Sequence, residues 1–268
     1  MTIARRALVY VYRHRRLPNW HNPKRFTDKV NWRIVRDRRD VLIGTCDKLA
    51  MKRRVASVAA VRVPQTYWTG TDLRELALVD LPGDWVLKPN HRTAKVIFGQ
   101  NKPDIETLIA QTDGWLDEEN WAQSGEWAYG HSARVFLVEE RIGTGPKPPV
   151  DYQFYVYDGV AKYAMVITGR PSDTTATFYD RDWCRVASNP GGEHLPHADA
   201  PPNLDEMFEV AGRIGRGFDF IRVDLYNVDG TIWFGETTPY PVSGMGRFVP
   251  DDFDFELGSH WQLPSSTR

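Results

Sequence analysis

Apolar and polar residues alternate on both sides of Asp229-Gly230 within residues 220–250, and this pattern predicts a β-hairpin. Side chains alternate between the two faces of a strand, so the register decides which of them lie together. A two-residue loop would turn Asp224 away from Glu236. A three-residue loop over 228–230 pairs residue 222 with residue 236, and we adopt it as our prediction. It places four polar side chains on one face: Arg222, Asp224, Glu236 and Thr238.

Two neighbouring carboxylates repel each other unless a cation lies between them, and oxygen ligands suit Mg²⁺. Asp224 and Glu236 therefore predict a magnesium site, with Thr238 as a neutral third ligand. An equally simple interpretation is a surface hairpin in which Arg222 and Glu236 form an ordinary ion pair. The spacing of these residues leaves both interpretations open.

Other periodic stretches predict further elements. Residues 46–58 indicate a helix capped by Asp47, with Lys48 and Lys52 one turn apart on one face. The helix predicted from Asn203 has a capping-box Glu206. Strands are predicted over 84–89, 134–142, 151–157 and 161–169, with a returning strand within 90–99, a linker at 143–149 and an irregular stretch over 171–202.

Lys88 ends the apolar strand 84–89, just before Pro89. A lysine that faces inward from such a strand is costly unless an anion meets it. Taken alone, Lys48 and Lys52 are equally well explained as a solvated basic helix face. A phosphate-binding pair of lysines becomes a hypothesis only together with the rest of the chain.

Composition narrows the class of protein. The 268 residues carry a net charge of −1, and no apolar run reaches the length needed to cross a bilayer. Cys46 and Cys184 provide neither a disulfide framework nor a zinc set, so we expect a cytoplasmic protein. Residues 1–62 hold 17 Lys and Arg against 4 Asp, a local charge of +13, which suggests either solvated helix faces or an acidic carrier or other anionic partner.

Ten short motifs occur in one order along residues 20–250. They are Asp47-Lys48 with Lys52, residues 85–91, Glu126-Trp127 with Tyr129, residues 138–142, Asp151-Tyr152 with Phe154, Phe178-Tyr179-Asp180 with Trp183, Asn203-Leu204 with Glu206-Met207, residues 222–226, Gly235-Glu236 and Gly244. In this order they resemble the ATP-grasp superfamily, and above all its TupA-like branch, which is linked to teichuronopeptide biosynthesis.

The resemblance implies an α+β protein with the ATP-grasp fold, in which two α+β lobes with antiparallel sheets clasp ATP. We expect a basic N-terminal segment over residues 1–46, shorter than the first domain of many such ligases. A lysine-bearing lobe is expected over 47–142, and a magnesium-binding lobe over 143–268.

The resemblance also implies roles for individual residues. Lys48 and Lys88 correspond to lysines that contact the phosphates of ATP, and Asp151 to the acid that holds the ribose. Residues 139–142 correspond to the hinge that binds adenine, with Glu139 in it and with backbone groups of Glu140 and Ile142 as the main contacts. Asp224 and Glu236 correspond to the magnesium ligands, and Arg222 lies beside the phosphoryl group in transfer.

The implied activity is ATP- and Mg²⁺-dependent ligation of a carboxylate to an amine through an acyl phosphate. Its substrates would be small or polymer-linked, in cell-surface polymer or specialised-metabolite biosynthesis. Two alternatives stay open: a kinase of the same fold, and a non-catalytic scaffold. The scaffold is favoured by residues 92–95, Arg-Thr-Ala-Lys, which stand where related sequences carry the glycines of a mobile flap.

Overall fold

Two antiparallel sheets organise the chain in the computed structural model, which describes residues 2–117, 120–143, 149–168, 175–190, 192–193, 195 and 197–265. The smaller sheet has the strand order β1-β4-β2-β3. Its strands are β1 Thr66–Gly70, β2 Asp84–Pro89, β3 Ile97–Gln100 and β4 Phe136–Glu140. It is flanked by η1 Leu73–Leu78 and α5 Ile105–Gln111, and its apolar side chains form a separate core.

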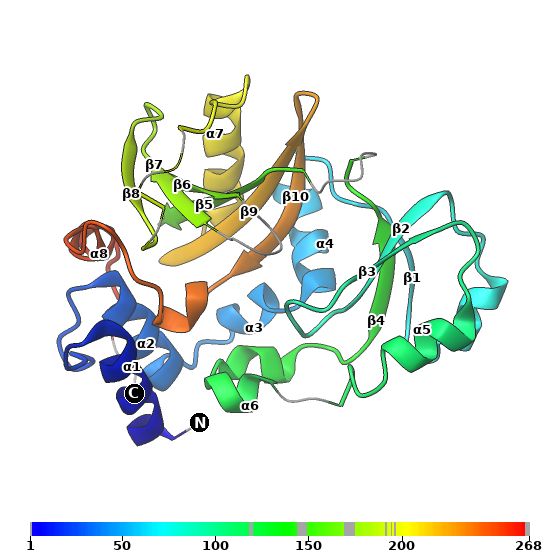
Figure 1. The fold of residues 1–268 in the computed structure, drawn as a ribbon, viewed down its shortest axis with the longest axis horizontal. Helices are drawn as coiled ribbons and strands as arrows, with labels where there is room; N and C mark the ends of the chain where they lie inside the picture. The colour runs from blue at the N-terminus through cyan, green and yellow to red at the C-terminus, as the bar shows by residue number, and fades with distance from the viewer. Residues whose placement is uncertain are drawn as a thin grey trace.

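The larger sheet has the strand order β10-β9-β5-β6-β7-β8. Its strands are β5 Asp151–Tyr157, β6 Val160–Thr168, β7 Thr175–Tyr179, β8 Arg185–Ser188, β9 Phe220–Val228 and β10 Thr231–Thr238. Helix α7 Leu204–Gly215 packs on one face, and α2 Phe26–Arg36 and α8 Phe253–Ser259 lie on the other (Figure 1). Each face of this sheet therefore has its own apolar core.

The β9–β10 hairpin forms as predicted, but with a different register. Thr231 pairs with Val228, so the loop has only the two residues Asp229 and Gly230, and the predicted three-residue loop is wrong. An extra residue at Gly235 then shifts the register, and Glu236 pairs with Asp224. A β-bulge of this kind moves all later side chains of its strand to the opposite face. The two carboxylates therefore share a face for a reason that the loop length did not indicate.

Two further predictions need correction. The stretch 171–202 is not irregular throughout, because β7 and β8 lie in it and extend the sheet from β6. Asn203 precedes α7 but makes no capping bond with its side chain. Its amide instead donates to the Gly230 carbonyl at 3.0 Å, and so ties the start of α7 to the hairpin loop.

Helix α4, Lys48–Val58, lies between the two sheets (Figure 1). Asp47 caps it as predicted, with 2.8 Å between its Oδ1 and the amide of Ala50. Met51 and Val55 are buried in the core of the larger sheet, although α4 precedes the smaller sheet in the chain. Helix α4 therefore fixes Lys48 on the larger lobe, the part of the chain built on the larger sheet. The N-terminus of α4 contacts the smaller lobe, which is built on the smaller sheet. The predicted domain boundaries stay a prediction.

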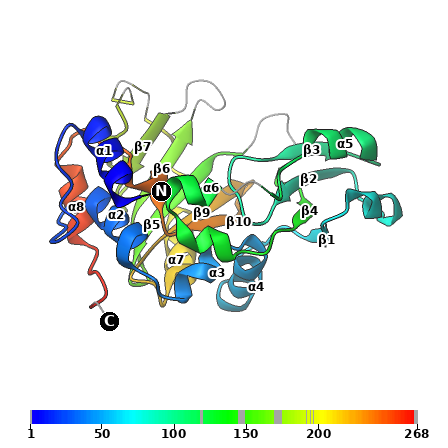
Figure 2. The same cartoon turned by 90° about the horizontal axis from the view of Figure 1, so that it is seen from below.

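The N-terminal region forms α1 Ile3–His14, α2 and α3 Val41–Thr45, and the first two lie with α8 at one end of the molecule (Figure 2). Many of its cations have partners within the chain. Arg33 and Arg39 both bind Asp219, at 2.6 and 2.7 Å, and Arg16 binds Asp254 at 2.6 Å. These ion pairs account for part of the local charge of +13, and the structure adds no support for an acidic carrier.

Candidate functional site

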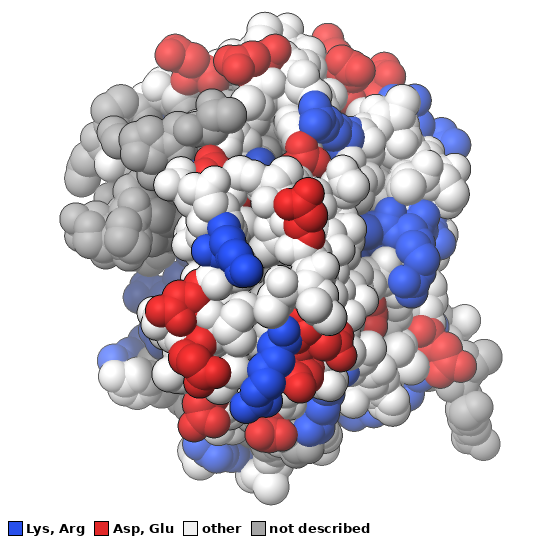
Figure 3. All heavy atoms as spheres, turned by 90° about the vertical axis from the view of Figure 1, so that its right-hand side faces the viewer, with Lys and Arg blue, Asp and Glu red and all other residues white. Residues whose placement is uncertain are grey.

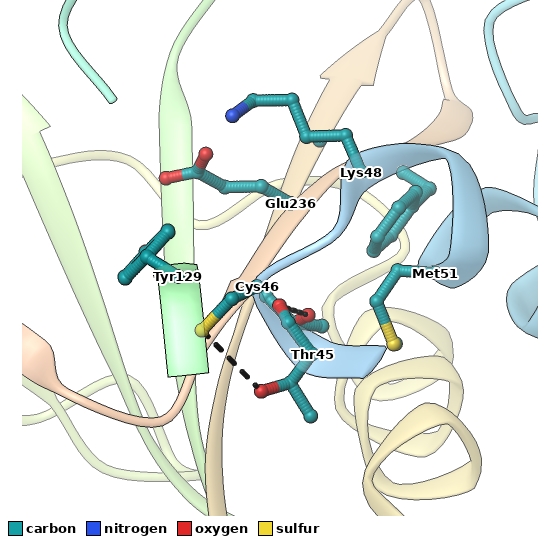
Figure 4. A pocket seen from close by; sticks show the side chains of 9 residues that line it. Thr45, Cys46, Lys48, Met51, Tyr129 and Glu236 are labelled. Carbon is teal, nitrogen blue, oxygen red and sulfur yellow. Dashed lines mark hydrogen bonds between the residues drawn. The ribbon is translucent and has the colours of Figure 1, made fainter. Parts of the chain in front are cut away.

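A small cavity lies where α4, β10 and η2 Trp127–His131 meet. Lys48 lines it from the start of α4, Cys46 from the end of α3, Glu236 from β10 and Tyr129 from η2. Figure 4 shows the head groups of Lys48 and Glu236 near each other, with Tyr129 across from them. The cavity thus places a cation and an anion from distant parts of the sequence around one space.

Lys48 is the first residue of α4. Its Nζ donates to the carbonyl of Asn90, at 3.3 Å, and to that of Arg92. Burial lowers the pKa of Lys48 to about 8, and the attraction of Glu236 only partly opposes this effect. A cation this close to losing its proton gains from an anion beside it.

Glu139 is buried in β4 between two lysines. Its Oε2 accepts from Lys52 at 2.7 Å, and its Oε1 forms an ion pair with Lys88. Burial alone would raise the pKa of Glu139, but Lys88 and Lys52 outweigh it and hold this pKa below its ordinary value. The inward Lys88 therefore meets an anion of the chain itself, and the side chain of Glu139 orients the lysines.

Arg222 and Asp224 form a bidentate pair on β9, with 2.7 Å from Nε to Oδ1 and 2.6 Å from Nη2 to Oδ2. Glu236 lies 3.6 Å from Arg222 Nη2. Thr238 pairs with Arg222, as Glu236 does with Asp224, so all four residues predicted for this face share it. The Arg222–Glu236 ion pair of the surface interpretation exists too, but Asp224 is the closer partner of the guanidinium, and it is buried.

The electrostatics of this cluster fit a divalent cation. Burial, together with the charges of Asp151 and Glu236, raises the pKa of Asp224 to about 8 against the opposing effect of Arg222. Carboxylates whose charge is this costly are stabilised by a metal ion between them. Among the described residues no group of three or more His, Cys, Asp or Glu could hold a metal ion. Magnesium at Asp224 and Glu236 would therefore need further ligands from phosphate, water or Thr238.

The other predicted residues lie around this centre. Thr238 pairs with Arg222, and its hydroxyl accepts from the amide of Tyr240 at 3.3 Å. Asp151 begins β5, is buried and accepts from Gln153 at 2.9 Å. Glu140 ends β4 and binds Arg62 at 2.8 Å, and Ile142 follows two residues later. Their contacts with a nucleotide stay predictions.

Residues 92–95 connect β2 to β3 without a glycine. Arg92 is buried and donates to the carbonyl of Trp115 at 3.4 Å. The Lys95 ammonium lies 5.4 Å from the centre of the Trp115 ring. Ala94 has a φ of 59°, a left-handed conformation that glycine adopts at no steric cost. The backbone thus keeps a glycine-like turn, and both long side chains approach the same tryptophan.

Some residues of the site were not singled out from the sequence. Tyr129 and Cys46 line the cavity. The side chain of Asn90 forms hydrogen bonds with Asp47, Leu49 and Ala133. Asn90 and Tyr129 did belong to the ordered motifs, but nothing in their spacing assigned them a place. Their contacts join segments far apart in the sequence, which explains why local patterns did not indicate them.

The chain belongs to the TupA-like ATP-grasp family, whose sequence model matches residues 28–262. The predicted family and the predicted ATP-grasp fold of two α+β lobes are both confirmed. The chain is thus a member of a family of ATP-grasp proteins. No curated protein matches it. No helix of the described part is long and apolar enough to cross a membrane.

Solved structures of two ligases and a synthetase are similar at low identity. D-alanine–D-alanine ligase from Helicobacter pylori is 14% identical over 83% of this chain and 59% of its own, with a TM-score of 0.47. The Bacillus anthracis ligase complexed with ATP is 15% identical over 74% and 56%, with a TM-score of 0.44. N5-carboxyaminoimidazole ribonucleotide synthetase from Thermus thermophilus is 16% identical over 73% and 45%, with a TM-score of 0.42. The chain spans less than two thirds of each of these proteins.

Proposed function

We propose that the protein is an ATP- and Mg²⁺-dependent ligase that joins a carboxylate to an amine. One observation carries the proposal: Lys48 of α4 and Glu236 of β10 face one cavity, with Arg222 and Asp224 beside Glu236. Cations for phosphate oxygens and carboxylates for a metal ion are what phosphoryl transfer requires of a protein. The family match supports the same interpretation.

Lys48 and Lys88 are the proposed phosphate ligands. Lys88 shares Glu139 with Lys52, so the buried carboxylate keeps one cation when Lys88 turns to a phosphate. Lys48 donates to neutral carbonyls, and a phosphate oxygen would be a stronger acceptor for its ammonium group. Adenine is assigned to residues 139–142, through backbone groups of Glu140 and Ile142, and the ribose to Asp151.

Asp224 and Glu236 are the proposed magnesium ligands, with Thr238 as a weaker neutral one. Bound there, Mg²⁺ would neutralise the charge that develops on the phosphate oxygens. Arg222 is proposed to stabilise the phosphoryl group in transfer. Its N–H groups now bind Asp224, so a metal ion that takes over this carboxylate would leave the guanidinium available to the phosphate.

The proposed reaction has two steps. An oxygen of the substrate carboxylate attacks the γ-phosphorus of ATP, and the bond to the β-phosphate oxygen breaks to release ADP. The amine nitrogen then attacks the carbonyl carbon of the acyl phosphate. Inorganic phosphate leaves with the electron pair of the broken C–O bond, the amine loses a proton, and an amide remains. Lys88 and Arg222 are the catalytic residues of this proposal. We assign the pathway to cell-surface polymer or specialised-metabolite biosynthesis.

Calorimetric titration with a non-hydrolysable ATP analogue tests the nucleotide site. We expect Mg²⁺-dependent binding that weakens about 10- to 100-fold in Lys88→Ala, because a charge-assisted bond is lost. Lys102→Ala, at an exposed lysine, is the matched control and should bind like the unmodified protein. A folded protein that does not bind the analogue with Mg²⁺ present contradicts the proposal.

Product analysis separates the ligase from its alternatives. A ligase converts ATP to ADP and free phosphate only when an acid and an amine are both supplied, and an amide appears. A kinase yields ADP and a stable phosphorylated product, whereas a scaffold binds the nucleotide without turnover. The Asp224→Asn/Glu236→Gln double variant should lose turnover, and full turnover in this variant rejects the metal assignment.

A further inference from the structure

A second cavity, of about 420 Å³, adjoins the first, and none of the roles proposed above is assigned to it. It shares Tyr129 with the first cavity. Its walls come from residues 91–93, which follow β2, and from α6 Asn120–Ser124 with the start of η2. This volume is that of a site for a small organic molecule. The cavity therefore lies next to the reacting groups and has room for a second substrate.

Two polar side chains in its wall lack hydrogen-bond partners among the residues that the structure describes. His91 is only 4% exposed, yet neither of its ring nitrogens makes a bond there. The indole Nε1 of Trp121 is also buried and has no hydrogen-bond partner among the described residues. Both residues line the cavity. Buried polar groups almost always find a partner, so these groups point to a polar ligand.

Glu126 gives the cavity its acidic group. Burial raises the pKa of its carboxyl group, and hydrogen bonds from the Ser243 and Ser124 side chains oppose this. The neighbouring Arg6 attracts Glu126 but directs its own N–H groups to Asn31 and to the carbonyls of Ser124 and Ser243. A carboxylate placed in this way gains from a cation that reaches it through the cavity.

The remaining wall combines neutral polar groups with the guanidinium of Arg92. Burial, and after it the nearby cations Arg134, Arg92 and Lys48, lower the pKa of His91 to about 4, so its ring is neutral at pH 7 and offers one donor and one acceptor. Ser124, Thr93 and Gln123 add neutral polar groups. The Arg92 side chain also lines the cavity, with Nη1 donating to the Trp115 carbonyl outside it.

We infer that this cavity binds the amine substrate, a small polar primary amine whose ammonium group donates to Glu126. An oxygen atom of the same molecule accepts from the indole N–H of Trp121. A carboxylate beside Glu126 would meet its like charge, so this position in the second cavity favours the amine over the carboxylate substrate. The inference rests on the proposed function, because it places one of the two substrates of that ligase.

Nuclear magnetic resonance of the full chain tests the inference without ATP or Mg²⁺. The indole N–H signal of Trp121 is assigned by its loss in Trp121→Phe. Ethanolamine and ethylene glycol are the probes, since they differ mainly in an ammonium group in place of a hydroxyl. We expect ethanolamine to shift the Trp121 signal in a saturable way, and ethylene glycol to leave it unchanged at the same concentrations.

Glu126→Gln should weaken ethanolamine binding at least about tenfold, because a charge-assisted hydrogen bond is lost. Glu126→Asp keeps the charge and should keep the preference for ethanolamine, which provides a second test if the glutamine variant does not fold. Glu209→Gln, at an exposed position of α7, is the matched control and should bind like the unmodified protein.

Three outcomes overturn the inference: equal shifts with both probes, undiminished ethanolamine binding in Glu126→Gln, or acetate binding at this signal in preference to ethanolamine. The ATP-analogue titration is read separately on the same preparation. A protein that binds the analogue with Mg²⁺ but not ethanolamine keeps the proposed function and loses this inference. Binding of ethanolamine without binding of the nucleotide rejects the proposed function, and the second cavity is then an amine-binding site outside a ligase.

Discussion

The side-chain amide of Asn90 donates to the carboxylate of Asp47, with 2.8 Å between Nδ2 and Oδ2, and so joins the end of β2 to the start of α4. The same amide donates to the Ala133 carbonyl at 3.0 Å, and its oxygen accepts from the Leu49 amide at 3.0 Å. Asn90 is fully buried. Because α4 packs on the larger lobe and β2 belongs to the smaller one, these bonds fix Lys48 relative to Lys88.

Asn90→Ala should destabilise the protein by about 2 kcal/mol or more, because it leaves several buried polar groups without a partner. It should also weaken binding of the ATP analogue, since the two lysines lose their fixed separation. Chemical denaturation and calorimetry measure the two effects. Asn22→Ala, at an exposed position, should change the free energy of unfolding by no more than about 0.5 kcal/mol. An Asn90→Ala variant as stable as this control contradicts the role assigned to Asn90.

The local sequence predicted the parts of the site that depend on neighbouring residues. The Asp47 cap needs only residues up to Ala50, and the hairpin needs only the turn residues Asp229 and Gly230. Both turn residues adopt positive φ, at 51° and 80°, as a tight two-residue turn requires. The isolated Gly235 within the strand was a usable signal for a bulge, and reading it would have corrected the register.

The remaining features depend on contacts between distant segments. Helix α1 buries Arg6 and His14 beside Tyr10 and exposes Leu8 and Tyr12, so polar side chains share its buried face. The reason is that carbonyls of residues 243 and 244 accept from Arg6 and approach His14, so the buried polar groups find partners across the fold. Strand β7 likewise pairs along the edge of β6, and β8 in turn pairs with β7. On the face of the smaller lobe drawn in Figure 3, acidic and basic side chains are interspersed.

Gly235→Ala tests the bulge that pairs Glu236 with Asp224. A Cβ at this position would lie 2.8 Å from the Tyr226 ring and 3.0 Å from the Asp224 carbonyl, so the strand must shift. We expect a loss of about 1–3 kcal/mol in stability, as for other overpacked positions, and weaker Mg²⁺-dependent binding of the analogue. Gly246→Ala is the control, because its Cβ would make only ordinary contacts from 3.5 Å. If Gly235→Ala keeps both properties, the bulge does not set the metal site.

Binding of the ATP analogue should weaken as the pH rises through about 8, the lowered pKa of Lys48. Only the protonated amine attracts phosphate, and phosphate raises its pKa in the complex, so the contribution is complete below this pH and is lost above it. At pH 9 we expect about tenfold weaker binding than at pH 7 from this residue. Lys48→Arg stays charged throughout and should remove that part of the dependence.

The ratio of the two dissociation constants, unmodified protein to Lys48→Arg, is the quantity to measure. In this ratio the effects of other groups that titrate in the same range cancel. Asp224 is one of these groups, because its pKa is also raised to about 8. Loss of a proton from Asp224 favours magnesium and so acts in the opposite direction. A ratio that stays constant between pH 7 and pH 9 contradicts the assignment of Lys48 as a phosphate ligand.

Ala94→Gly tests whether the turn after β2 still works as a phosphate-covering flap. Ala94 is exposed and held at a φ of 59°, a conformation that costs a residue with a Cβ about 1 kcal/mol. Glycine there should therefore stabilise the protein by roughly 0.5–1 kcal/mol, whereas Ala133→Gly, at an exposed position outside the left-handed region, should destabilise it. Because the substitution removes only a methyl group, it leaves Arg92 and Lys95 in place. If the turn covers the phosphates, its freer motion changes ATP turnover measurably, and unchanged turnover in a stabilised Ala94→Gly variant shows that the turn is a fixed connection between β2 and β3.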